Sequence, residues 1–217
     1  MPHGFPSPGV GGSELTRLLA RLAEAPTAEG RPVFAERLGH WLGWTGAIAL
    51  AAALNAAPAA GGGTQAAAAE EADFQRVAAA LEAAIAAEPR EDVSSPTDFG
   101  PYRRHCLALQ QAMQDGIGAL RQRLRDALAR RAPALARLAA LDAVLDPALA
   151  PQERALLGLV PLRLQAHFER LGRAAGADPR WPDAFAQDLR RVLRAELAHR
   201  LLPAQGLLDA LRTPTPP

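Results

Sequence analysis

Residues 101–131 read PYRRHCLALQQAMQDGIGALRQRLRDALARR, and the apolar side chains of this stretch follow a helical spacing. They stand at steps of 3, 4, 4, 3, 4 and 4 residues: Cys106, Leu109, Met113, Ile117, Leu120, Leu124 and Leu128. These steps repeat every 11 residues, a period that keeps an apolar stripe on one side of a nearly straight helix. The stretch therefore predicts one long helix that packs within a bundle. Pairing of this helix in a coiled coil is the alternative.

The composition favours helices throughout the chain of 217 residues. Alanine and leucine dominate, whereas the β-branched and aromatic residues that favour strands are scarce. All 24 basic residues are arginine. This bias suits bidentate binding of anions. A GC-rich genome is the alternative explanation, since it also accounts for the excess of alanine, glycine and proline.

Further amphipathic segments lie on either side of the long helix. Apolar residues recur at helical spacing in two N-terminal stretches: Leu15, Leu18, Leu19 and Leu22, then Phe74, Val77, Leu81 and Ile85. We expect a disordered arm over 1–12, an N-terminal helical pair over 13–57, a Gly-rich linker over 58–66, a helix over 67–90, a polar loop over 91–98, a helical bundle over 99–212 and a disordered tail over 213–217. The sequence thus predicts an all-α fold: an antiparallel helical bundle around a long central helix, with a small N-terminal helical unit.

Prolines divide the expected bundle into its helices. After a break at Pro133, a short helix is expected over 132–146. Pro151 then opens another helix, which Pro161 kinks. Pro203 separates a short terminal helix from the one before it.

Residues 41–54, WLGWTGAIALAAAL, form the most apolar stretch of the chain. A membrane-spanning helix needs about 20 predominantly apolar residues, and this run ends too soon. We expect it to be the second half of an amphipathic helix with a stripe at Phe34, Leu38, Trp41, Leu42, Thr45 and Ile48. Trp41 is therefore expected in the core, and Trp44, at the margin of the stripe, is the candidate anchor for a partner.

Charge is distributed unevenly between the two halves. Residues 1–100 hold 6 Arg against 12 Asp and Glu, a balance of −6, whereas residues 101–217 hold 18 Arg against 11, a balance of +7. Such halves are suited to attract one another within the fold or to hold a partner of mixed charge. The chain begins MPHGFPSPGVGG, which has neither the basic nor the apolar part of an export signal, and Cys106 is the single cysteine. We therefore expect a cytoplasmic protein.

Few residues point to catalysis or metal binding. Glu196 and His199 have the Glu-x-x-His spacing of carboxylate-bridged di-iron bundles, but such a site needs two pairs of this kind. Glu36 and His40 supply half a site at most. His105 and Cys106 are adjacent, so their side chains diverge on a helix. We expect no catalytic residue, metal or cofactor, and a protein that is not an enzyme.

Two arginine clusters are the strongest candidates for a binding surface. Six arginines lie between Gly116 and Arg137 against Asp126 alone: Arg121, Arg123, Arg125, Arg130, Arg131 and Arg137. A second group comprises Arg190, Arg191 and Arg194. Helix faces of this kind bind the phosphates of nucleic acids or anionic lipids. Pairing with the acidic N-terminal half, or simple solvation, is the alternative.

Several segments carry a family resemblance: FAERLGHWLGWTGAIALAAALN, DFGPYRRHCLALQQAM, LRQRLRDALA, LARLAALDAVLD, FERL and LRAELAHRLLPAQGLLDAL. Together they resemble a bacterial family catalogued as domain of unknown function 3348, over about 13–56 and 97–211. The resemblance implies a helical cytoplasmic protein without an assigned activity. It also implies an accessory to an envelope complex, since family genes lie near those for proton-channel-like and OmpA-like proteins. The position of His199 is apolar in the family, which argues against a catalytic role.

The sequence therefore favours a non-enzymatic cytoplasmic interaction or scaffold protein, with Trp44 and the arginines of both clusters as candidate contacts to a protein partner. The alternative is a nucleic-acid-binding protein that uses the Arg-rich face of residues 116–137.

Overall fold

The computed structural model describes residues 14–23, 47–53, 65–88, 98–176 and 180–213. Within these ranges the regular structure is entirely helical, so the expected all-α class is confirmed. The helices are α1 (Glu14–Ala23), α2 (residues 47–53), α3 (Gln65–Ala86), α4 (Gly100–Arg131), α5 (Pro133–Leu157), α6 (Leu159–Ala175) and α7 (Trp181–Arg212).

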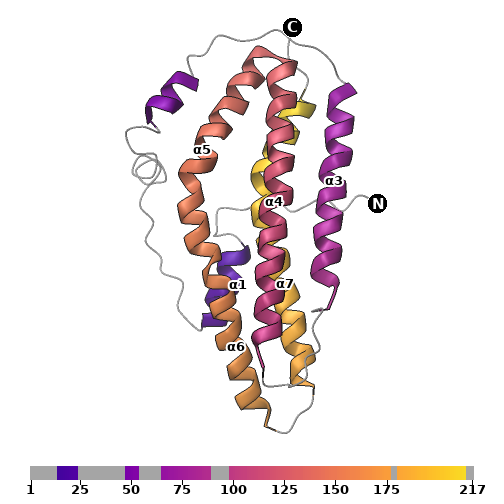
Figure 1. Cartoon of the computed structure of the whole chain (residues 1–217), viewed down its shortest axis with the longest axis vertical. Coiled ribbons are helices and arrows are strands. Elements are labelled where there is room, and N and C mark those ends of the chain that lie inside the picture. Colours follow the sequence, from indigo (N-terminus) through magenta and orange to yellow (C-terminus); the bar gives the residue numbers. More distant parts are fainter. Residues whose placement is uncertain (1–13, 24–46, 54–64, 89–97, 177–179, 214–217) are drawn as a thin grey trace.

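The long helices form an antiparallel bundle around α4 (Figure 1). α3, α4, the pair α5–α6 and α7 alternate in direction, so that α4 and α7 run parallel to each other in the middle. α3 packs against α4 and α7 on one side, and α5 packs against α4 on the other. The short α1 packs against α6 and α7.

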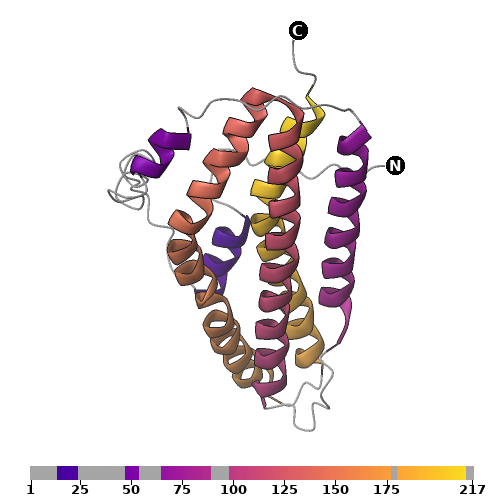
Figure 2. The same cartoon turned by 45° about the horizontal axis from the view of Figure 1, so that its top comes forward.

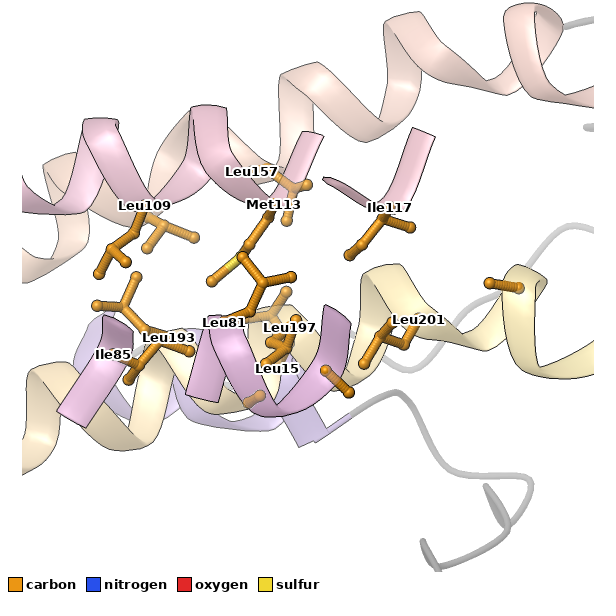
Figure 3. Packing of buried hydrophobic residues seen from close by; sticks show 14 of the residues in the cluster. Leu15, Leu81, Ile85, Leu109, Met113, Ile117, Leu157, Leu193, Leu197 and Leu201 are labelled. Carbon is orange, nitrogen blue, oxygen red and sulfur yellow. The ribbon is translucent and has the colours of Figure 1, made fainter. Parts of the chain in front are cut away.

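The apolar stripe of α4 lies in the core, as its spacing predicts. All seven of its members are buried. Figure 3 shows Leu109, Met113 and Ile117 opposite leucines of α7 and the apolar side of α3. The stripe thus packs within a bundle of the same chain rather than in a separate coiled coil.

Two helices of the N-terminal half, α1 and α3, overlap the segments that the sequence predicts to be helical. In α1 the expected face is buried at Leu15, Leu18 and Leu19. The helix expected over 67–90 spans Gln65–Ala86, so Gln65 belongs to α3 rather than to the linker. At the other end of the chain Thr213, expected in the tail, still donates its backbone N–H to the carbonyl oxygen of Asp209.

Some predictions concern residues outside the described ranges. These are the arm over 1–12, both Trp41 and Trp44, most of the linker and nearly all of the polar loop. One member of the stripe expected around Trp41 is described: Ile48 is 55% exposed in α2. Its place on a stripe that faces the core is therefore wrong, because none of the described helices buries this side chain.

The expected break at Pro133 is confirmed, since α4 ends at Arg131 and α5 begins at Pro133, but the later prolines do not divide the bundle as expected. α5 continues through Pro147 and Pro151, and α7 continues through Pro203. All three prolines are exposed, so their rings lie outside the core, where a ring within a helix meets little packing. The break comes instead at Gly158, and Pro161 lies in the first turn of α6, where a missing N–H costs little.

Candidate functional site

Arg121 and Arg125 of α4 bind two carboxylates of α5. Arg121 Nη2 lies 2.6 Å from Asp142 Oδ1, and Arg121 Nη1 lies 2.7 Å from Asp146 Oδ1. Arg125 Nη2 lies 3.1 Å from Asp146 Oδ2. The two arginine side chains are only 14% and 13% exposed. They hold α5 against α4 and present little charge to an external ligand.

Among the other candidate arginines, Arg123 and Arg194 pair with an acidic residue on another helix, whereas Arg191 pairs with one on its own helix. Arg123 of α4 pairs with Asp73 of α3, opposite the side that faces α5, so Arg121, Arg123 and Arg125 do not form one face. On α7, Arg194 pairs with Glu82 and Arg191 with Asp188, while Arg190 is partly buried. Arg212 also pairs with Glu71 of α3. Ion pairs between α3 and the basic helices α4 and α7 thus join the acidic and basic halves.

A polar cluster around Glu196, composed of Gln110, Gln114, Glu196 and Arg200, lies between α4 and α7 and reaches the surface at Gln114. Glu196 is fully buried. Gln110 Nε2 donates to both of its carboxylate oxygens, at 3.1 and 3.0 Å, and Arg200 Nη2 lies 2.9 Å from Oε1. Arg200 Nη1 donates to Gln114 Oε1 at 3.0 Å. Both oxygens of Glu196 are therefore engaged by donors from the protein, which suits a structural carboxylate.

Glu196 and His199 do not form a metal site with other described residues. His199 Nδ1 is buried without a hydrogen-bond partner, but no group of three His, Cys, Asp or Glu in the described part of the chain could hold a metal ion. Glu36 and His40 lie outside the described residues.

Cys106 and its neighbour His105 both have pKa values that their surroundings shift. Burial raises the pKa of the Cys106 thiol to about 12, and the negative charge of Glu196 adds to the shift. Burial also lowers the pKa of His105. The thiol therefore stays protonated at neutral pH, and thiolate is the nucleophilic form.

His167 of α6 lies in a polar link that sequence reasoning did not single out. Arg170 Nη2 donates to its Nδ1 at 3.0 Å, and its Nε2 lies 2.9 Å from Asp188 Oδ2. Because arginine only donates, Nδ1 accepts and Nε2–H donates to the carboxylate. Arg170 also donates to the carbonyl oxygen of Leu22 at 3.2 Å, which ties α1 to α6. Only the i, i+3 spacing of His167 and Arg170 hints at this link in the sequence.

The outer apolar face of α5 comprises Leu141, Val144, Leu145, Ala148 and Leu149. Their spacing places them on one side of the helix. All five are partly buried, yet none belongs to the core cluster of the described helices or packs against it. Between residues 138 and 152 the charged residues are Asp142 and Asp146, and both pair with α4. This face is therefore apolar, uncharged and outside the core.

In the described part of the chain, no helix has both the length and the hydropathy required to cross a membrane. Comparison with curated proteins and with solved structures gives no match. A family model described as Protein of unknown function (DUF3348) matches residues 1–213, which agrees with the resemblance in the helical segments. Because the match covers nearly the whole sequence, the chain belongs to the DUF3348 family of proteins of unknown function.

Proposed function

We propose that this chain is a non-enzymatic helical interaction protein of the cytoplasm that docks a protein partner through the outer apolar face of α5. The observation that carries the proposal is the composition of that face. A helix on the surface of a globular protein normally directs its charged residues outward. In α5 the arrangement is reversed, since Asp142 and Asp146 are held inward by Arg121 and Arg125.

The spacing of the face suits a helical partner. Its five residues follow the i, i+3, i+4, i+7 and i+8 positions over two turns, which is how amphipathic helices recognise each other. Exposed leucines elsewhere on the bundle, Leu107 on α4 and Leu162 on α6, add apolar surface. The partner class that the family resemblance implies is an envelope complex with proton-channel-like and OmpA-like components.

The polar groups of the bundle support a binding role rather than catalysis. Glu196 and His167 are engaged on both of their polar atoms, and the Cys106 thiol is protonated at neutral pH. Their hydrogen bonds join helices to one another, which is the function of structural polar groups.

Site-specific photo-crosslinking in the native cell tests the proposal. A photoreactive amino acid at Leu145 is compared with the same amino acid at Ala119, an exposed position on α4. We expect an adduct with an envelope protein, identified by mass spectrometry, from Leu145 and not from Ala119. Equal adducts from both positions, or none from Leu145, would contradict docking through α5.

Nucleic-acid binding is the alternative, and it relies on the more exposed arginines. Arg123, Arg191 and Arg194 are 42%, 62% and 51% exposed, but each also has a carboxylate partner. Fluorescence anisotropy with duplex DNA at low salt separates the two functions. Binding that falls steeply with salt and is lost on Arg123→Glu and Arg194→Glu would favour the alternative.

A further inference from the structure

α2 is a second apolar element outside the core cluster, and it lies beside α5. Residues 47–53 contain no charged side chain. In both Figure 1 and Figure 2, α2 lies next to the upper part of α5, on the side away from α4 and α3. The two helices are thus neighbours in space, although they lie far apart along the chain.

The burial pattern of α2 identifies its inner side. Ala53 is 9% exposed, yet it does not belong to the core cluster of the described helices. Leu50, one turn earlier, is partly buried, whereas Ala51 and Ala52 are exposed. Residues three apart share a side of a helix, so Leu50 and Ala53 form the covered side. Ala53 is therefore covered from outside the core cluster, and α5 is the described helix that lies beside α2 in both views.

We infer that the side of α2 formed by Leu50 and Ala53 covers the outer apolar face of α5 in the free protein, and that a docking partner must displace α2 to bind. The occupant of this face is thus a segment of the same chain, and α2 acts as an internal competitor. The part of the inference that concerns the partner rests on the proposed function. Displacement is feasible because none of the described residues of α2 belongs to the core cluster.

The covering role of α2 can be measured in the purified protein by cysteine labelling. Leu145→Cys places a thiol on the outer apolar face, and Cys106 serves as an internal control because it is buried in the core. This variant is combined with Ala53→Asp or with Ala52→Asp, the same substitution on the covered and the exposed side of α2. The rate of maleimide labelling is followed by intact-protein mass spectrometry.

We expect Ala53→Asp to accelerate labelling at position 145 on the order of tenfold, because a carboxylate without a partner disfavours the covered arrangement. Ala52→Asp leaves the rate unchanged, and Cys106 stays unlabelled in both variants. If Ala53→Asp unfolds the bundle, Cys106 is labelled as well. In that case Ala53→Ser is used in place of Ala53→Asp, and position 145 is again expected to be labelled faster than in the Ala52→Asp variant.

Two results would overturn the inference. One is an equal labelling rate in the Ala53 and Ala52 variants with the core intact. The other is protection at position 145 that weakens on dilution, which would mean that a second copy of the chain covers α5. A failure of the proposed function is distinguishable, because it would abolish the envelope adduct from Leu145 in cells while leaving the labelling difference in the purified protein.

Discussion

The side-chain amide of Gln110 donates to the carbonyl oxygen of Leu157 at 3.1 Å, and this is the carbonyl group that Pro161 leaves without its helical donor. In an uninterrupted helix the N–H of residue 161 would bond to residue 157, but proline has no N–H. The same amide reaches Glu196 of α7. Gln110 therefore connects the junction of α5 and α6 with the polar cluster around Glu196.

Replacing Gln110 with leucine should destabilise the bundle. The change leaves the Leu157 carbonyl and part of the Glu196 carboxylate without their donor, and a loss of this kind costs about 1–3 kcal/mol of unfolding free energy. Urea denaturation followed by circular dichroism measures the difference. Gln111→Leu is the matched control, because Gln111 is exposed and bonds only with Asp115 on its own helix. Equal stability of the two variants would mean that the Gln110 hydrogen bonds add nothing.

The Cys106 thiol should be inert in the folded protein. With a pKa of about 12 it contains almost no thiolate at pH 8, and its side chain is fully buried. We expect a disulfide reagent such as dithionitrobenzoate to react with the native protein only as fast as the protein unfolds. In 6 M guanidinium chloride the reaction should be immediate, because even hyperstable proteins have unfolding midpoints of roughly 5 M. Rapid reaction of the native protein at pH 8 would refute the burial of this side chain.

The ion pairs of α4 should differ in their contributions to stability. Arg121→Gln removes a guanidinium group that binds two carboxylates in a largely buried setting, and we expect a loss of roughly 1–3 kcal/mol of unfolding free energy. Arg123→Gln removes a more exposed partner of Asp73 and should cost less than about 1 kcal/mol. Thermal unfolding of both variants gives the comparison. A larger loss for Arg123→Gln would reverse the assignment of the structural arginines.

His105 should make the fold less stable in mild acid. Its pKa is lowered from 6.5 in the folded protein because burial disfavours the charged ring, so the unfolded chain binds the proton more readily. Its contribution to stability is therefore fully present above pH 6.5 and is lost as the pH falls through the lower, folded pKa. The Tm of the wild type should drop more than that of His105→Gln between pH 7.5 and pH 5.5, values that lie about one unit on either side of the ordinary histidine pKa. Parallel drops in the two proteins would show that His105 does not contribute.

The sequence by itself determined which sides of the helices are buried. The stripe from Cys106 to Leu128 in α4 and the leucines of α1 lie in the core because burial of apolar surface drives folding, and periodicity alone records it. The excess of acid in one half and of arginine in the other was compatible with contact between the halves, but it left a partner of mixed charge open, and the tertiary structure shows the ion pairs between α3 and the basic helices α4 and α7.

Only the tertiary structure decided what individual residues do. A proline stops a helix or is tolerated within it according to whether its ring faces solvent, and Pro147, Pro151 and Pro203 all face outward. The partners of Arg121 and of Glu196 come from other helices, across sequence separations that no local pattern encodes. Ile48 fits an apolar stripe and is nevertheless exposed, since burial depends on whether another helix packs on that side. Local spacing fixes the sides of a helix, whereas the packing of helices far apart in the sequence fixes which side chains meet.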